Sequence, residues 1–265
     1  MLVTTVYRPS PEAAAKAKAL AEEIGGRWVE RGDDSLPRLA RRHGDAEFLV
    51  VSESELRYIR DATVKDGASP ALRFHPGMAM LRVRRLMDGG RDPLVDASGA
   101  APGDAVIDCT AGLASDAIVL SFAVGAAGNV VALESEPIPA LLIREGLSRY
   151  QSGVPELDEA MRRIRVVRTH HLDFLRRQPA DSADIVYFDP MFRIPLMDST
   201  SIQPLRSVAN SASLTPEAVR EARRIARKAV VMKDHRSVPY GELARLGFAV
   251  IARESSNIAY GVIRV

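Results

Sequence analysis

Cysteine, long apolar runs and a strong net charge are all scarce or missing in this sequence. Cys109 is the only cysteine among 265 residues, which excludes internal disulfides and a zinc site built from cysteines. No apolar run reaches the length of a membrane span, and the first residues lack the charged region and long apolar core of a signal peptide. We therefore expect a cytoplasmic protein in a reducing environment, and we predict no metal site.

Charge and lysine content leave the partner of the protein open. The net charge is only +2, so global electrostatics does not indicate a nucleic-acid-binding protein. Few of the 36 basic residues are lysines, namely Lys16, Lys18, Lys65, Lys228 and Lys233. The planar arginine fork suits phosphate, but a biased genome composition explains the same skew equally well. The 46% of hydrophobic residues suffices for one large core and a small extension.

Residues 1–75 are predicted to form a small N-terminal α/β subdomain. The first expected helix begins after Ser10, with Pro11 at its first position, and ends at Gly25-Gly26. The subdomain contains no recognisable catalytic constellation, and Trp28 is interpreted as a core anchor. The expected strands are 3–6, 28–29 and 48–51, with a hairpin of 56–60 and 71–74, and the expected helices start at Pro11 and span 36–43.

Residues 76–265 are predicted to form the main domain, since strands alternate there with helices, a pattern typical of a parallel sheet. Seven strands are expected, and the last two close as an antiparallel hairpin. The predicted fold class is therefore α/β, with a seven-stranded, mostly parallel sheet. The expected strands are 105–110, 129–134, 164–168, 183–188, 229–233, 246–253 and 258–265, and the expected helices are 78–87, 117–124, 137–150 and 216–228.

The fourth strand of this domain leads directly into a candidate catalytic motif. The run 183–188 is largely apolar, as in a buried strand, and Pro190 ends it. The motif 189–192 then supplies a carboxylate, a backbone carbonyl and an aromatic ring at the strand's carboxyl end, where open α/β sheets bind ligands. Two acceptors suit an amine with two N–H bonds. Taken alone, an ordinary strand end with an aspartate-proline turn is an equally good interpretation.

The turn after the first strand points to a nucleoside-containing ligand. Asp108 closes the strand, Gly112 opens the turn, and Glu134 ends the next strand, where an acid can bind ribose hydroxyls. A dinucleotide fingerprint needs three glycines, but Thr110 and Ala114 stand at two of those places. Asp108 would also repel a diphosphate. These features favour S-adenosylmethionine over a nicotinamide dinucleotide.

These two motifs carry a family resemblance. The segments 106–117 (VIDCTAGLASDA) and 189–192 (DPMF) resemble class I S-adenosylmethionine-dependent methyltransferases with a Rossmann-like sheet. More narrowly, they are similar to the RsmJ type, which methylates the exocyclic N2 of guanine in small-subunit ribosomal RNA. The resemblance runs from about Leu56 to Arg236, and the first 55 residues do not share it. Ala114-Ser115 stand where that family has Gly-Arg.

The resemblance and the sheet geometry together predict the site residues. The turn after the third strand holds two histidines where related enzymes often place an acid on the adenine amine, and the loop after the DPMF motif lacks the family's lysines. The predicted donor-binding residues are Asp108, Thr110, Ala111, Gly112, Leu113, Ser115, Asp116, Glu134, Ser135, His170, His171 and Asp189; the predicted catalytic residues are Asp189, Pro190, Met191 and Phe192.

Several basic residues are candidates for contact with RNA phosphate. Arg82 and Arg85 lie on the helix 78–87, which is expected to flank the donor or touch RNA, whereas Arg84 is interpreted as part of a solvated face. Arg193 and Lys233 lie near the carboxyl edge of the sheet. Lys233 as a structural strand-end residue is an equally good interpretation. Residues 1–75 are expected to help present RNA rather than to catalyse.

The chemistry predicted for the motif is methylation of an exocyclic nucleobase amine. The Asp189 carboxylate and the Pro190 carbonyl would accept the two N–H bonds, which aims the nitrogen lone pair at the methyl donor. Phe192 would stack on the base, which in folded RNA must first leave its stack. The alternatives are methylation of DNA adenine or of a protein amide, a nicotinamide oxidoreductase, and a non-catalytic donor-binding module.

Overall fold

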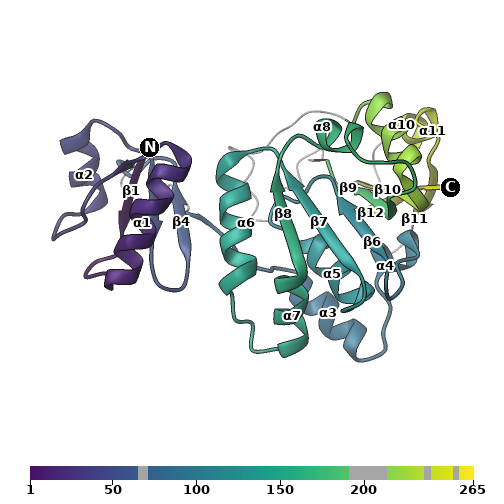
Figure 1. Ribbon diagram of the computed structural model, residues 1–265, viewed down its shortest axis with the longest axis horizontal. Helices are drawn as coiled ribbons and strands as arrows, with labels where there is room; N and C mark the ends of the chain where they lie inside the picture. Colours follow the sequence, from purple (N-terminus) through teal and green to yellow (C-terminus); the bar gives the residue numbers. More distant parts are fainter. Residues whose placement is uncertain (65–70, 191–213, 236–239, 253–256) are drawn as a thin grey trace.

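Two β-sheets organise the chain in the computed structural model, which describes residues 1–64, 71–190, 214–235, 240–252 and 257–265. The smaller sheet uses the first 73 residues in the order β2-β1-β3-β4-β5, with β1, β2 and β3 parallel and β4 and β5 antiparallel additions. In Figure 1 this unit lies beside the larger sheet. Its elements are β1 (Leu2–Thr5), α1 (Pro11–Ile24), β2 (Arg27–Trp28), α2 (Leu36–His43), β3 (Phe48–Val51), β4 (Leu56–Ile59) and β5 (Leu72–Arg73).

The larger sheet has seven strands in the order β11-β12-β10-β9-β6-β7-β8. The five strands from β10 to β8 are parallel, and the hairpin of β11 and β12 adds antiparallel to β10, as predicted. The strands are β6 (Ala105–Asp108), β7 (Asn129–Glu134), β8 (Ile164–Arg168), β9 (Ala183–Phe188), β10 (Ala226–His235), β11 (Ala249–Ala252) and β12 (Ile258–Arg264).

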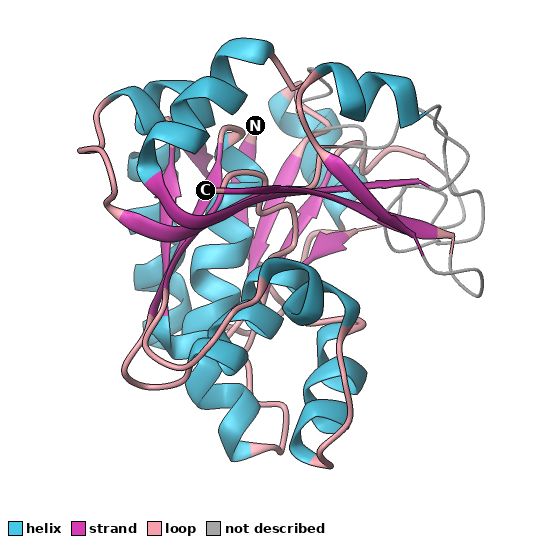
Figure 2. Ribbon diagram, turned by 90° about the vertical axis from the view of Figure 1, so that its right-hand side faces the viewer, coloured by secondary structure: helices cyan, strands magenta, loops and turns pink. Residues whose placement is uncertain are grey.

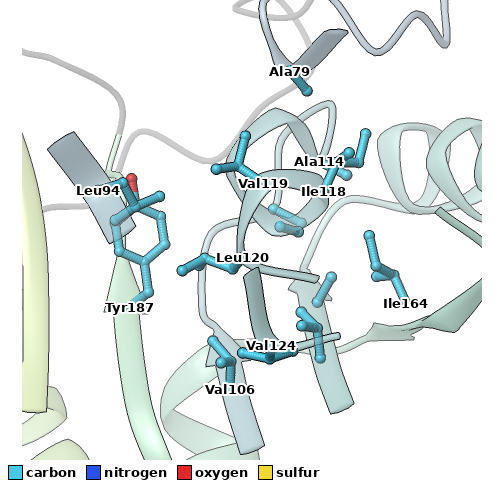
Figure 3. Packing of buried hydrophobic residues seen from close by; sticks show 14 of the residues in the cluster. Ala79, Leu94, Val106, Ala114, Ile118, Val119, Leu120, Val124, Ile164 and Tyr187 are labelled. Atoms are coloured by element: carbon cyan, nitrogen blue, oxygen red, sulfur yellow. The ribbon is translucent and has the colours of Figure 1, made fainter. Parts of the chain in front are cut away.

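Helices cover both faces of this sheet, as Figure 2 shows. One face packs an apolar core against α3, α4, α5 and α7, and the labelled side chains of Figure 3 belong to that core. The opposite face packs against α8, α10 and α11. The helices are α3 (Ala79–Met87), α4 (Pro93–Ser98), α5 (Ser115–Val124), α6 (Pro137–Arg149), α7 (Pro155–Arg163), α8 (His171–Arg176), α10 (Pro216–Ile225) and α11 (Tyr240–Arg245).

Three helices and several element boundaries differ from the sequence-based expectation; the first strand of the large sheet, for example, ends at Asp108 rather than at Thr110. The short helices α4, α7 and α11 were not predicted, although Asp92 and Pro93 form a clear N-terminal cap for α4. The helix predicted to reach residue 228 ends at Ile225, because β10 already begins at Ala226. Ala226 is fully buried and pairs with Ala183 of β9, and this tertiary pairing overrides the helix propensity of the Ala-Arg-Lys run.

Helix α6 lies between the two sheets and belongs to both cores. Ile138, Leu141 and Leu142 pack on the core of the small sheet, whereas Ile143 and Leu147 pack on the core of the large one. The connection after β5 is held on the same helix, since Phe74 meets Tyr150 edge to face with ring centroids 5.8 Å apart. The predicted domain boundary at residue 75 therefore falls in a connection that is packed on α6.

A glycine in the middle of α6 permits this packing. A Cβ atom added to Gly146 would lie 2.0 Å from Cγ of Phe74, far inside van der Waals contact. We expect Gly146→Ala to lower the free energy of unfolding by about 1–3 kcal/mol, even though alanine is the better helix former, because the Phe74 ring must shift. Urea denaturation measures the change.

The exposed Ser148, one half-turn further along α6, supplies the control for this test. Ser148→Ala removes only a side-chain hydrogen bond to the Glu145 carbonyl and should change stability by about 0.5 kcal/mol or less. A Gly146→Ala variant as stable as the parent protein would show that the Phe74 packing does not constrain this position.

Candidate active site

The carboxyl ends of three neighbouring parallel strands bring together the predicted site. Asp108 ends β6, Glu134 ends β7, and Asp189 follows β9, which lies beside β6. Thr110 links two of these strand ends, since its Oγ1 accepts a hydrogen bond from the Asp189 backbone N–H at 2.5 Å. The edge is the one at which open parallel sheets bind ligands.

Asp108 supports the turn from within the protein. Its residue surface is only 1% exposed, and its Oδ1 accepts the Thr110 N–H at 3.0 Å. Burial raises the pKa of this carboxyl to about 8, so at neutral pH Asp108 is predominantly protonated and uncharged. The carboxyl therefore shapes the turn, and it brings little negative charge to the site.

The β6–α5 turn offers backbone donors to a ligand. Gly112 and Ala114 both adopt left-handed backbone conformations, with φ of 55° and 62°, and the second is strained for a residue with a side chain. No side chain caps the first turn of α5, which starts at Ser115. Backbone N–H groups at such a helix start suit a carboxylate. Leu113 packs at the base of this turn, where the two cores meet.

Glu134 joins this turn to the end of β7. Its carboxylate accepts the Gly112 N–H at 3.2 Å through Oε2 and the Glu136 N–H at 2.9 Å through Oε1. Burial raises the pKa of Glu134. The neighbouring Ser135 hydroxyl contacts the side chain of Glu136. The carboxylate thus stands where a ribose diol would meet it, beside the start of α6.

The two histidines after β8 form an aromatic pair. Nδ1 of His170 accepts the Leu172 N–H and caps α8. The His171 ring lies 4.3 Å from that of His170 and meets the Phe188 ring edge to face at 5.7 Å. Burial lowers the pKa of His171 to about 4, so this ring is uncharged at neutral pH. Two adjacent aromatic rings of this kind suit contact with the flat, uncharged face of an adenine.

Asp189 lies in a cluster of ionised side chains. Its Oδ2 meets Nζ of Lys233 at 2.8 Å, and the same ammonium meets Oδ2 of Asp116 at 2.9 Å. Tyr187 donates its hydroxyl to that Asp116 oxygen at 2.8 Å. The Asp189 side chain remains 25% exposed, so a substrate can reach it. Burial and the Asp116 charge raise the pKa of Asp189 to about 6, despite the Lys233 ammonium, which lowers it.

Two of the predicted RNA contacts need correction. The Arg82 guanidinium holds the Asp92 carboxylate through two hydrogen bonds, of 2.7 and 2.9 Å, and also pairs with Asp116, so it turns inward rather than toward solvent. The Lys233 side chain is 15% exposed, and its ammonium forms ion pairs with two carboxylates. Neither side chain is placed for a phosphate contact. Arg85, on the same helix as Arg82, is exposed.

Three predicted residues, Met191, Phe192 and Arg193, lie outside the described residues, and so does the long connection that we expected after the motif.

The sequence analysis did not predict two residues that contribute to the charged cluster, Tyr187 and Asp92. Both left a signal, because a tyrosine two residues before Asp189 points to the same side of the strand, and Asp92-Pro93 is a helix start. In the parts of the chain that the structure describes, no cluster of histidine, cysteine, aspartate and glutamate suits a metal ion, and no helix could cross a membrane.

The comparisons with known proteins agree with this geometry. The family model described as "Putative SAM-dependent methyltransferase" matches residues 37–250, and the chain belongs to that family. A solved structure, the SAM-dependent methyltransferase NGO1261 from Neisseria gonorrhoeae, shares the fold with a TM-score of 0.64 at 18% identity, covering 100% of this chain and 96% of that one. The protein is thus a methyltransferase that uses S-adenosylmethionine (SAM).

Individual relatives extend over nearly the whole chain. YpiP of Bacillus subtilis (strain 168), described as uncharacterized, is 38% identical over 263 residues, which cover 99% of both proteins. Ribosomal RNA small subunit methyltransferase J of Pseudomonas syringae pv. syringae (strain B728a) is 26% identical, covering 94% of this chain and 93% of the relative. The same-named protein of Pseudomonas aeruginosa (strain LESB58) is 28% identical over 90% of each chain.

The extent of these matches corrects one expectation. The family model begins at residue 37, and the relatives cover more than 90% of the chain, so the resemblance is not limited to residues after 55. The expected start of the resemblance was based on short motifs, and the N-terminal unit contains no such motif. Its similarity lies in the scattered residues of a packed core, which a reading of motifs cannot detect.

The residues around the three strand ends fit the methyl donor. Glu134 can accept the ribose hydroxyls, the His170–His171 ring pair can flank the adenine, and the uncapped start of α5 can take the carboxylate of the amino-acid part. A single turn glycine is enough, because the donor carries no pyrophosphate.

We expect Glu134→Ala to weaken binding of the demethylated donor by about tenfold to a hundredfold, the effect of losing a charged hydrogen-bond acceptor. Isothermal titration calorimetry measures it. Asp173→Ala is the matched control, because Asp173 is an acid on α8 with a 61% exposed side chain, and this variant should bind as the parent does. Equal affinity of the Glu134→Ala variant, or tight NADH binding by the parent protein, would contradict the assignment.

Proposed function

We propose that this methyltransferase modifies an exocyclic amine of a nucleobase in small-subunit ribosomal RNA, with guanine N2 as the target. The observation that carries the proposal is the Asp189 carboxylate, accessible at the end of β9 and held through one oxygen by Lys233. Two relatives that align over at least 90% of this chain bear the name of small-subunit ribosomal RNA methyltransferases, which supports RNA as the substrate class.

The chemistry follows from the acceptors at this strand end. An exocyclic amine is a weak nucleophile, since its lone pair is delocalised into the ring. Asp189 binds Lys233 through Oδ2, so Oδ1 can accept one amine N–H, and the carbonyl of Pro190 can accept the other. These two contacts orient the nitrogen lone pair out of the ring plane, and orientation of this kind supplies a large part of a rate enhancement.

The donor supplies an electrophilic methyl group on a sulfonium sulfur. As the new N–CH₃ bond forms, the S–CH₃ bond would break with its electron pair remaining on sulfur, so that the donor leaves as a neutral thioether. The nitrogen gains positive charge and becomes strongly acidic. The Asp189 carboxylate, with its pKa of about 6, is basic enough to accept the proton that the amine then loses. The Asp189 side chain therefore has two functions, orienting the amine before transfer and accepting its proton afterwards.

The substrate assignment is tested with radiolabelled donor and small ribosomal subunits, or their RNA, from a strain that lacks the gene. Nucleoside mass spectrometry of the product should show N2-methylguanosine. Duplex DNA and a protein acceptor serve as competing substrates. Label in either of these, with none in the RNA, would overturn the proposal, and loss of donor turnover on all acceptors would indicate a binding module.

We expect Asp189→Ala to lower turnover at least about 100-fold while donor affinity changes little, because the variant loses the acceptor that orients the amine. Asp189→Asn should retain more activity, since an amide oxygen still accepts a hydrogen bond. Single-turnover rates and donor affinity are measured together. Wild-type turnover by the Asp189→Ala variant would show that the motif is only a strand end.

Arg85 remains the predicted RNA contact on α3, and we expect Arg85→Glu to weaken RNA binding and reduce the salt slope by about 1. Arg149→Glu is the control: Arg149 is an exposed arginine in the last turn of α6, which runs back to the opposite edge of the sheet. Filter binding across a salt series measures both. If Arg85→Glu and Arg149→Glu give the same slope as the parent, α3 does not contact phosphate.

A further inference from the structure

Five ionised side chains of alternating sign form a continuous chain that ends at the candidate catalytic carboxylate. Asp92 pairs with Arg82, Arg82 with Asp116, Asp116 with Lys233, and Lys233 with Asp189. They come from separate elements: the N-terminal cap of α4, then α3, α5 and β10, and finally the residue after β9. The chain of ion pairs therefore connects the carboxyl edge of the sheet to three helices, α3, α4 and α5.

This chain is almost entirely enclosed. The exposed fractions of the side chains are 1% for Asp92, 16% for Arg82, 8% for Asp116 and 15% for Lys233, and they rise to 25% at Asp189. Burying charge is costly even when it is paired, and apolar residues of similar volume stabilise a fold as well or better. Stability alone therefore does not account for five charges, and the chain opens to solvent at the end where the reaction is proposed to occur.

We propose that Lys233 is a positioning residue for methyl transfer: anchored by Asp116, it holds the Asp189 carboxylate ionised and in place, with Oδ1 directed to the substrate amine. This inference rests on the proposed function of Asp189. It assigns Lys233 an action through another residue, in place of contact with RNA. Arg82 and Tyr187 hold Asp116, and thereby hold Lys233 indirectly.

The two neighbours of Lys233 act on Asp189 in opposite directions. The Lys233 ammonium lowers the pKa of Asp189, whereas the Asp116 carboxylate raises it. Other titratable groups close to this cluster are Asp108 on β6, Tyr187 on β9 and Tyr260 on β12. Asp108 is mostly protonated at neutral pH, and burial raises the pKa of both tyrosines, so these three groups stay uncharged near the pKa of Asp189.

The sign of the pH dependence follows. Asp189 must be ionised to accept the proton that the methylated amine loses, so the rate should fall as the pH drops through about 6. The midpoint of this acidic limb of the pH–rate profile should move upward by about 1–3 pH units in Lys233→Met, which lacks the ammonium. That is the usual effect of one adjacent opposite charge. Removing the like charge in Asp116→Asn should move the midpoint downward. A side chain with a merely structural role would not produce shifts of opposite sign.

The first experiment needs no substrate. The aspartate side-chain carboxyl carbons are labelled with ¹³C, the Asp189 signal is assigned from its loss in Asp189→Asn, and its titration is followed by NMR. We expect a midpoint near 6 in the parent, a higher one in Lys233→Met and a lower one in Asp116→Asn. An unchanged midpoint in Lys233→Met overturns the inference, whatever the substrate of the enzyme is.

The second experiment measures single-turnover rates on small-subunit RNA across the same pH range. Lys233→Met should lose at least about tenfold in rate at pH 7 with donor affinity unchanged, and Lys233→Arg should restore part of it. In an Asp189→Asn background the same substitution should change the rate about twofold or less, because Lys233 acts through Asp189. Full additivity of the two substitutions overturns the inference.

Lys228 supplies the matched control. It is a lysine of the same strand, ion-paired with Asp104 at the opposite, amino-terminal edge of the sheet, so Lys228→Met removes a lysine–aspartate pair far from Asp189. Its pH limb should stay at the parent position. If Lys233→Met does not fold, the Asp116→Asn variant tests the inference by itself. A midpoint of the acidic limb that does not move downward in this variant contradicts the inference. A parent enzyme inactive on RNA would overturn the proposed substrate, and the NMR titration would still test the Lys233 contact.

Discussion

The Asp116 carboxylate is the interaction on which the active-site edge depends. It accepts contacts from a helix that precedes the sheet, from the tyrosine hydroxyl of β9 and from the ammonium of β10. The cationic partners of Asp116 hold its pKa far below the usual range of a carboxyl, despite its burial, so Asp116 is ionised at neutral pH. One side chain in the first turn of α5 thereby connects α3, β9 and β10 at the carboxyl edge of the sheet.

The site separates two kinds of carboxyl group by their surroundings. Burial raises the pKa of Asp108, which is mostly neutral, whereas Asp116 pairs with two cations and is charged at neutral pH. Asp189 lies between these extremes, since one cation and one anion act on it. A general base works best when its pKa lies close to the pH at which the enzyme operates. Three acids within one sheet edge thus differ in charge because of their neighbours, although their chemical type is the same.

Much of this arrangement could be predicted from the sequence. The strand-helix alternation and the Asp-Pro strand end predicted a parallel sheet with its site at the carboxyl edge, because those signals are local. The roles of Arg82 and Lys233 could not be predicted, since their partners depend on strand order and on how α3 meets α5. An arginine and a lysine near a nucleic-acid site invite assignment to phosphate, and only the packing shows that both turn inward. The similarity of the N-terminal unit was also missed, because a packed core leaves no motif.

Helix α6 gives the N-terminal unit a significance beyond its lack of catalytic residues. The helix begins three residues after Glu134, and its apolar side chains are divided between the cores of the two sheets. Deleting residues 1–64 would expose Ile138, Leu141 and Leu142 to water on the helix that directly follows Glu134. The small sheet therefore protects this helix from solvent. Replacing the small sheet by another unit would therefore require new apolar side chains on the face of α6 that now packs against it.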